Sequence, residues 1–318
     1  MENKTYDLII VGGGPAGVSA AVYAARKRLK TLLILAEWGG QSIVSEYIYN
    51  WIGSPSIAGH ELAKNFKDHV LANAKTKENK DSTLEIQEGE KVILVSKNED
   101  KTFNVKIESG KEFHTKTILI SSGSGRRKID AINADRLEHK GLTYCASCDG
   151  PLFSGMDVAV IGGGNAGFES ASQLLAYCNS VTLLHRNPEY KAEEITVEKI
   201  SKNPKFKGIL DVTILEIKGE KFVDGLVYKQ NQTGEVHEIK VSGIFVEIGQ
   251  IPNTSFVKDI VQLDQIGRIK IDPWTGKTNT EGIWAAGDST NVLYHQNNIA
   301  SGDGVKALED IYLYIHTK

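Results

Sequence analysis

The sequence Asp7-Leu8-Ile9-Ile10-Val11-Gly12-Gly13-Gly14-Pro15-Ala16-Gly17 gives the strongest indication of the fold. Residues 6–11 form a short apolar run typical of a strand buried in a parallel sheet, and the Ala-rich segment 18–28 predicts a helix. Between them, Gly12 permits a tight turn, Gly14 lets the backbone approach a pyrophosphate, and Gly17 lets the helix pack on the strand. Free N–H groups and the dipole at the helix N-terminus favour the phosphates there. We therefore expect a dinucleotide site that includes Gly12, Gly14, Pro15, Ala16 and Gly17.

A second strand and an acidic residue extend this site. Residues 31–35 are mostly apolar and predict the next strand. Glu37 stands just past the end of that strand, where an acid that binds a ribose is expected. The alternative is that Glu37 is an exposed loop carboxylate without a ligand. We predict the ribose contact and leave the alternative open.

The same strand–glycine–helix pattern occurs a second time. Residues 157–161 form another apolar run, a second glycine motif follows at 162–167, and a helix is predicted to about residue 177. One GxGxxG motif is a weak signal, but two copies, each between a strand and a helix, are much rarer by chance. We therefore predict a second dinucleotide site that includes Gly162, Gly164, Asn165 and Ala166.

Basic residues follow the strand predicted at 180–184, where the ribose of the second nucleotide would lie. NAD sites place an acid at this point, whereas NADP sites offer arginine to the 2′-phosphate. His185, Arg186 and Lys191 make the position basic, although Arg186 is the sole arginine. Lys191 is a point charge without the planar fork of a guanidinium. The pattern favours NADPH and leaves NADH open.

The order of these elements predicts an α/β protein with two Rossmann-like dinucleotide-binding domains, the second inserted in the first. We expect an FAD-binding domain at residues 1–124 and 249–318, and an NAD(P)H-binding domain at residues 125–248. The boundaries rest on two glycine-bearing crossings, one at Gly123 and one at Gly249.

Further strands and a last helix complete the two domains. Strands at 84–95, 103–108 and 112–120 suit a small flanking sheet, and those at 211–218, 225–229 and 238–240 a β-meander. A strand at 282–286 leads into Gly287-Asp288, whose carboxylate can hold a cofactor hydroxyl, and a helix follows over about 298–315. A helix that begins beside a flavin can stabilise the negative charge of the reduced ring.

Two cysteines lie between the glycine motifs, in the sequence Cys145-Ala146-Ser147-Cys148-Asp149. A disulfide across so short a loop would add only about 2 kcal/mol on the loop-entropy model, against about 4.7 kcal/mol for a 100-residue loop. Structural stapling is therefore a poor reason for the pair, and reversible thiol–disulfide exchange is a better one. Half of a zinc site and two buried cysteines are the alternatives. Because a structural zinc site needs four ligands and the only other cysteine is Cys178, which we expect to be buried, we predict no metal site.

The composition is that of an ordinary globular protein. The 318 residues are 41% hydrophobic and 24% charged, which is enough apolar material for a sizeable core. A net charge of −3 gives no electrostatic reason to expect nucleic acid or an anionic membrane as a partner. The sequence has no apolar run long enough to span a bilayer and no signal-peptide pattern at its start, and three cysteines cannot form a secreted disulfide framework. We expect a cytoplasmic protein.

These motifs together resemble those of the low-molecular-weight thioredoxin reductases over nearly the whole chain. The match also extends to the flavin half of the alkyl hydroperoxide reductase flavoprotein, through Gly141-Leu142-Thr143-Tyr144 and Asp149-Gly150-Pro151-Leu152-Phe153. That flavoprotein carries an additional thioredoxin-like domain, which this chain lacks, so the resemblance favours a partner supplied in trans. The residues that carry the likeness to the reductases are Gly12–Gly17, Gly39-Gly40-Gln41, Cys145–Asp149, Gly162–Gly167, Pro252-Asn253-Thr254, Ala286-Gly287-Asp288 and Tyr294-His295-Gln296.

The resemblance implies a role for each matching residue. Cys148 would face the flavin, Cys145 would attack the disulfide of thioredoxin or a thioredoxin-like protein, and Asp149 would be the acid that protonates the leaving thiolate. The family also implies a homodimer. FAD would be held by the first glycine motif together with Gly40, Gln41, Asn50, Gly123, Gly287, Asp288, His295 and Gln296.

The sequence departs from the family pattern at three places. Asn187 and Lys191 stand where the family usually has arginines that clamp NADPH, and Gly167 stands where it usually has alanine. His295 and Asn297, on either side of Gln296, replace an arginine or lysine and a small or aliphatic residue. Three alternative functions therefore stay open: a reductase that takes electrons from reduced ferredoxin, a dithiol oxidase that uses oxygen, and a non-enzymatic flavoprotein redox sensor.

Overall fold

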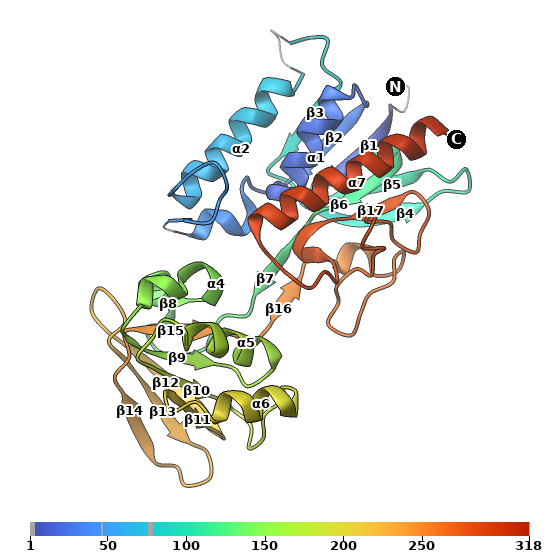
Figure 1. Ribbon diagram of the computed structural model, residues 1–318. Helices are drawn as coiled ribbons and strands as arrows, with labels where there is room; N and C mark the ends of the chain where they lie inside the picture. Colours follow the sequence, from blue (N-terminus) through green and yellow to red (C-terminus); the bar gives the residue numbers. More distant parts are fainter. Residues whose placement is uncertain (1–3, 46, 76–78, 318) are drawn as a thin grey trace. The chain divides into compact units, whose positions relative to one another are not determined.

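The computed structural model describes residues 4–45, 47–75 and 79–317, and the chain divides into two compact units (Figure 1). The first unit comprises Met1–Gly125 and Ile251–Lys318, and the second comprises Arg126–Gln250. The chain leaves the first unit once and returns once, through β7 (Ser124–Arg126) and β16 (Gln250–Pro252), which pair as a two-stranded sheet. The predicted fold class, α/β with one Rossmann-like domain inserted in another, is confirmed.

A seven-stranded sheet with helices packed against it forms the first unit. In space its strands follow the order β3-β2-β1-β6-β5-β4, and β17 also pairs with β6. The pairs among β1, β2, β3, β6 and β17 are parallel, whereas β4 and β5 are antiparallel additions. The bounds are β1 (Thr5–Val11), β2 (Thr31–Leu35), β3 (Leu84–Glu88), β4 (Val92–Lys97), β5 (Phe103–Ile107), β6 (Glu112–Ile120), β17 (Ile283–Ala285), α1 (Pro15–Arg26), α2 (Gly59–Asn73) and α7 (Asn297–Thr317).

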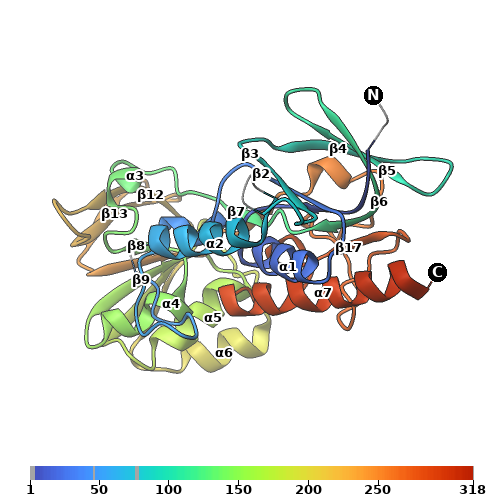
Figure 2. The same cartoon turned by 90° about the horizontal axis from the view of Figure 1, so that it is seen from above.

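Strand β1 is apolar and buried from Leu8 to Val11 because both faces of this sheet are covered there. Leu8 and Ile10 belong to the core cluster that includes residues of α1, α2 and α7. Ile9 and Val11 point the other way, into a cluster with residues of β4 and β5. Both views show α1 and α7 side by side on one face of the sheet (Figures 1 and 2). The carboxyl end of β1, where Gly12 follows, is thereby held at the N-terminus of α1.

The second unit repeats this plan around a five-stranded parallel sheet in the order β11-β10-β9-β15-β8. Along β9, Val158 and Val160 face α5 and α6, whereas Ala159 and Ile161 face the antiparallel three-stranded sheet β12-β13-β14. The bounds are β8 (Leu142–Thr143), β9 (Asp157–Ile161), β10 (Ser180–Leu184), β11 (Phe206–Ile209), β12 (Val212–Lys218), β13 (Gly225–Gln230), β14 (Val236–Ile239), β15 (Gly243–Val246), α3 (Ala134–Leu137), α4 (Ala146–Asp149), α5 (Asn165–Leu174) and α6 (Glu194–Ser201).

Two expectations about the first unit were wrong. The strand expected at 84–95 is two strands, because Gly89 has a φ of +80° and turns the chain between β3 and β4. The small flanking sheet is not separate. Strand β6 is long enough for its first half to pair with β5 and its second half with β17, so the antiparallel strands continue the main sheet.

The helices differ from expectation mainly at their ends. Helix α1 begins at Pro15, three residues before the predicted start at 18, and α7 begins at Asn297. Helix α6 and the short helix α4 around the cysteines have no counterpart among the predicted elements. Within the described part of the chain, no helix combines the length and apolar character that crossing a membrane requires.

We predict that Gly167→Ala destabilises the second unit by about 1–3 kcal/mol, the usual cost of overpacking. A Cβ at this position would lie 1.9 Å from the carbonyl oxygen of Gly162. Gly164→Ala is the matched control, because a Cβ there would meet nothing within 4 Å. Thermal or urea unfolding of both variants checks the prediction, and equal midpoints for the two would contradict it.

Candidate functional site

The two glycine motifs have nearly the same local geometry. A Cβ on Gly12 would lie 2.2 Å from the carbonyl oxygen of Ser121, and one on Gly162 would lie 2.2 Å from that of Glu247. A Cβ on Gly17 would lie 1.9 Å from the carbonyl oxygen of Gly12, and a Cβ on Gly167 would lie 1.9 Å from that of Gly162. These contacts leave no room for a side chain, so each motif brings the end of a strand against the start of a helix.

Both helices begin without a side-chain cap. Gly14 precedes α1 and Gly164 precedes α5, each in an extended conformation with ψ of −176°, and neither helix start receives a side-chain hydrogen bond. The first N–H groups of both helices are therefore available to an anion. A Cβ on Gly14 would have only the Cα of Gly40, at 3.9 Å, as a neighbour, so it would project into open space. This is the arrangement that a bound pyrophosphate requires.

A cleft of about 490 Å³ opens beside the first motif, entirely within the first unit. Its walls come from the ends of β1, β2 and β6 and from the starts of α1 and α7. It is lined by most of the residues predicted to hold FAD, namely Gly12, Gly14, Pro15, Ala16, Glu37, Gly40, Gln41, Gly123, Gly287 and Asp288. The residues present therefore fit the adenosine, pyrophosphate and ribityl parts of FAD in one continuous groove.

Five predicted residues at or near this cleft have no role in common. Asn50 donates a hydrogen bond to the Oε1 atom of Gln296 at 3.0 Å. His295 places Nδ1 3.3 Å from Oδ1 of Asp288, close enough for an ion pair when the imidazole is protonated. Gly17 is buried under the motif and shapes the turn without facing the cleft. Glu37 is exposed at the mouth, which suits a ribose contact and leaves that contact a prediction.

The sequence did not single out several residues that line this cleft. Ser121 and Ser122 follow β6, and Asn297 begins α7. The position of the serines could have indicated their role, since ligands bind at the carboxyl ends of parallel strands. Asn297 was noted only as a departure from the family pattern. Its place in the cleft depends on how α7 packs, and no sequence motif reports that packing.

Some of the residues predicted for the second dinucleotide site are accessible to a ligand, whereas others already make hydrogen bonds within the protein. Gly164, Asn165 and Ala166 are accessible, but Oδ1 of Asn165 already accepts a hydrogen bond from the backbone N–H of Glu193 at 2.9 Å. Arg186 and Lys191 are exposed, so both charges can reach a phosphate. Arg186 lies at the end of β10, as the NADP pattern requires.

His185 supports the motif from beneath. Its ring is 8% exposed, and Nδ1 accepts a hydrogen bond from the backbone N–H of Gly163 at 3.0 Å. Burial lowers the pKa of His185, and the charges of Arg186 and Lys191 lower it further. A neutral imidazole matches the accepting role of Nδ1. A contact between His185 and a cofactor stays a prediction. In the structure His185 holds the glycine loop through its hydrogen bond with Gly163.

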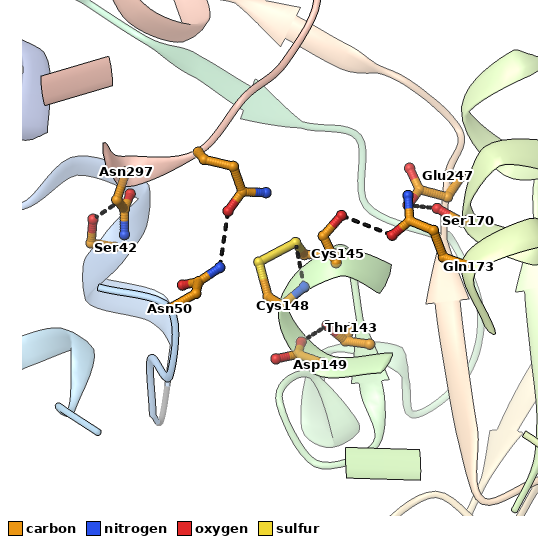
Figure 3. The surroundings of a disulfide bond; sticks show 12 residues. Ser42, Asn50, Thr143, Cys145, Cys148, Asp149, Ser170, Gln173, Glu247 and Asn297 are labelled. Carbon is orange, nitrogen blue, oxygen red and sulfur yellow. Dashed lines mark hydrogen bonds between the residues drawn. A yellow bond between two sulfur atoms is a disulfide. The ribbon is translucent and has the colours of Figure 1, made fainter. Parts of the chain in front are cut away.

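Cys145 and Cys148 form a disulfide at the start of α4, with their Cα atoms 5.3 Å apart (Figure 3). The backbone N–H of Cys148 donates to Sγ of Cys145 at 3.2 Å. After reduction the same N–H group would stabilise a thiolate on Cys145. Cys178, in contrast, is buried and unpaired, as predicted, and burial raises the pKa of its thiol.

Asp149 lies directly behind the disulfide, at the end of α4. Burial raises the pKa of its carboxyl group, and a hydrogen bond from the hydroxyl of Thr143 acts in the opposite direction (Figure 3). His139 and Arg126 also favour the charged form, to a smaller extent. The net effect keeps Asp149 protonated to a higher pH than a free aspartate, which suits a group that donates a proton to a thiolate.

Glu247 is a second carboxyl group of this unit with a raised pKa, and no sequence motif selects it. It follows β15 beside Gly162, and Ser170 of α5 donates to Oε1 at 2.7 Å (Figure 3). Burial raises its pKa to about 7, Ser170 and Arg126 lower it, and Glu169 raises it. Ser121 occupies the corresponding place in the first unit, so comparison of the two motifs could have indicated Glu247.

The chain belongs to the pyridine nucleotide-disulphide oxidoreductase family, whose model matches residues 6–304. Proteins of this family bind FAD and a pyridine nucleotide. The resemblance noted in the sequence is confirmed. Among solved structures, the thioredoxin reductase of Streptococcus pyogenes superposes with a TM-score of 0.90 and 30% sequence identity, and the match covers 100% of both chains.

Two named relatives are considerably longer than this chain. The "NADH dehydrogenase" of Ferdinandcohnia aciditolerans is 36% identical over 99% of this chain and 58% of its own length. An alkyl hydroperoxide reductase component of Escherichia coli is 38% identical over 99% of this chain and 59% of its own length. This chain thus spans about three-fifths of the length of these relatives, so their activities and partners do not transfer to it directly.

We predict that Glu247→Gln stabilises the protein at pH 8 and has little effect at pH 5. The folded pKa of about 7 lies above the ordinary value of 4.5, so the folded state binds more protons between these values and loses stability as pH rises. At pH 8 the variant should gain about 1–3 kcal/mol. Unfolding at both pH values checks this, and a gain that is equal at pH 5 and pH 8 would contradict it.

Proposed function

We propose that this protein passes electrons from NAD(P)H through FAD and the Cys145–Cys148 disulfide to the disulfide of thioredoxin or a thioredoxin-like protein. The observation that carries the proposal is the disulfide at the start of α4, backed by the half-buried carboxyl group of Asp149. The family membership and the likeness to thioredoxin reductases support the same reaction. The proposed setting is the cytoplasm, where such thiols are kept reduced.

The two units have separate tasks in this proposal. The first unit holds FAD in its cleft, and the second binds the nicotinamide nucleotide at the start of α5. FAD, when bound, relays two electrons from the nicotinamide to the disulfide. Cys148 is the sulfur that receives them in the assignment proposed from the family pattern, which leaves Cys145 as a thiolate stabilised by the N–H group of Cys148.

The remaining steps use only protein groups. The Cys145 thiolate attacks one sulfur of the partner's disulfide and forms a mixed disulfide, while the other sulfur leaves as a thiolate. Asp149 supplies the proton that this leaving thiolate needs. The Cys148 thiol then attacks Cys145 and gives its proton to the partner's second sulfur as that sulfur leaves, which restores the internal disulfide and releases the partner as a dithiol. Two electrons and two protons enter the partner in each cycle. By the same resemblance, we propose that the enzyme works as a homodimer.

The electron donor has two candidates. Arg186 at the end of β10 favours NADPH, and its exposed guanidinium can bind a 2′-phosphate. The name of a relative, "NADH dehydrogenase", makes NADH the second candidate, since Asn187 and Lys191 leave the phosphate site without two of the usual arginines. Reduced ferredoxin is the outcome to consider when neither nucleotide reduces the flavin.

We predict that Cys145→Ser and Cys148→Ser each abolish thioredoxin reduction while the nicotinamide still reduces the flavin at the wild-type rate. Both cysteines act only after the flavin has been reduced, so the two half-reactions should separate. Stopped-flow absorbance of the flavin, followed by a thioredoxin turnover assay, measures them. Cys178→Ser is the control, because this buried thiol has no role in the cycle. Loss of flavin bleaching in either active-pair variant would refute the proposed order.

We also predict that Asn187→Arg combined with Lys191→Arg raises NADPH affinity at least about tenfold and leaves NADH affinity unchanged. Each charge-assisted hydrogen bond to a phosphate contributes about 1.5–3 kcal/mol, and about 1.4 kcal/mol corresponds to a tenfold change. Titration of each nucleotide into the oxidised enzyme gives both affinities. An equal gain for NADPH and NADH would show that no 2′-phosphate site exists at the end of β10.

A further inference from the structure

Three consecutive amide side chains, on Gln296, Asn297 and Asn298, connect the start of α7 to Ser42, Asn50 and Ile52 of the first unit. Asn50 donates to Gln296 at 3.0 Å, and Nδ2 of Asn298 donates to the backbone carbonyl of Asn50 at 2.6 Å. Oδ1 of Asn298 also accepts from the backbone N–H of Ile52 at 3.4 Å. These bonds fix the loop against the helix. They do not by themselves explain why Asn297 lies between them.

Asn297 differs from its two neighbours because it lines the cleft. Its Oδ1 atom accepts a hydrogen bond at 3.1 Å from the hydroxyl of Ser42, a residue that is only 3% exposed (Figure 3). Since the carbonyl end of the amide is held by this buried hydroxyl, the orientation of the side chain is set. Among the residues that the structure describes, none accepts a hydrogen bond from Nδ2. The amide therefore offers an unused donor at the wall of the cleft.

The cleft itself indicates which part of FAD meets this donor. The first glycine motif takes the pyrophosphate, and Glu37 marks the end where the adenosine ribose would lie. Asp288 and Asn297 line the part of the cleft formed by the loop after β17 and the start of α7, which leaves them to the ribityl chain and the flavin ring. The N-terminus of α7 favours negative charge in the same place. Reduction gives the flavin ring that charge, at its N1 and C2-carbonyl edge.

We propose that Asn297 is a positioning residue for the flavin, whose Nδ2–H group donates a hydrogen bond to the N1 and C2-carbonyl edge of the ring. A hydrogen bond to a charged acceptor is about twice as strong as one to a neutral acceptor. The contact therefore stabilises the reduced flavin more than the oxidised flavin and raises the midpoint potential. Ser42 acts through Asn297 by holding its carbonyl. The inference rests on the proposal that FAD occupies this cleft.

The test is the midpoint potential of bound FAD, measured by anaerobic equilibration with a reference dye. Asn297→Ala should favour the oxidised flavin about tenfold more than the wild type does, a shift of about 30 mV to lower potential. Asn297→Asp should lower it further, because a carboxylate would repel the reduced ring. Ser42→Ala should shift it in the same direction by less. Asn298→Ala is the matched control, which should weaken thermal stability and leave the potential unchanged.

The outcomes separate this inference from the proposed function. Flavin that stays bound with an unchanged potential in both Asn297 variants would overturn the contact and leave FAD in the cleft. An equal shift in Asn298→Ala would also overturn it, because the effect would then come from the loop. Loss of flavin from Asn297→Asp but not from Asn298→Asp would support the contact, since only Asn297 faces the ring. Wild-type protein that binds no flavin would defeat the proposed function itself.

Discussion

Each unit of this protein depends on a backbone carbonyl that lies too close to a glycine for any side chain to fit. In the first unit a Cβ on Gly12 would lie 2.2 Å from the carbonyl oxygen of Ser121, and in the second a Cβ on Gly162 would lie 2.2 Å from that of Glu247. These contacts draw the carboxyl end of one strand against the first turn of a helix whose N–H groups have no side-chain cap. An anion site follows from this steric arrangement before any side chain chemistry is considered.

The two strand–glycine–helix turns could be predicted from the sequence because only glycine, which has no Cβ, fits at their crowded positions. Strands β2, β9 and β10 have the predicted bounds, since short apolar runs between turn residues admit few alternatives. The sequence failed where local patterns carry no information about pairing. Nothing in residues 84–97 indicates that β3 joins the parallel strands whereas β4 joins β5, and the positive φ of Gly89 is visible only in the folded chain.

In the candidate site, too, local motifs could be predicted from the sequence and long-range packing could not. Residues that motifs identify, such as Gly14 and Asp288, line the cleft. Residues that act through long-range packing were missed, because Asn297 meets Ser42 across more than two hundred intervening residues. Burial is equally invisible in a sequence. It raises the pKa of Asp149, which was selected for its place beside the cysteines, and that of Glu247, which no motif distinguishes.

If FAD and the Cys145–Cys148 disulfide form one electron path, the oxidised protein accepts more electrons than the flavin alone can hold. Anaerobic titration of the oxidised protein with NADPH, and in parallel with NADH and reduced ferredoxin, measures how many equivalents the protein accepts. We expect about two nicotinamide equivalents per FAD, one for the flavin and one for the disulfide, each a two-electron couple. Uptake of about one equivalent, with both cysteines still resistant to alkylation, would show that the disulfide lies outside the electron path.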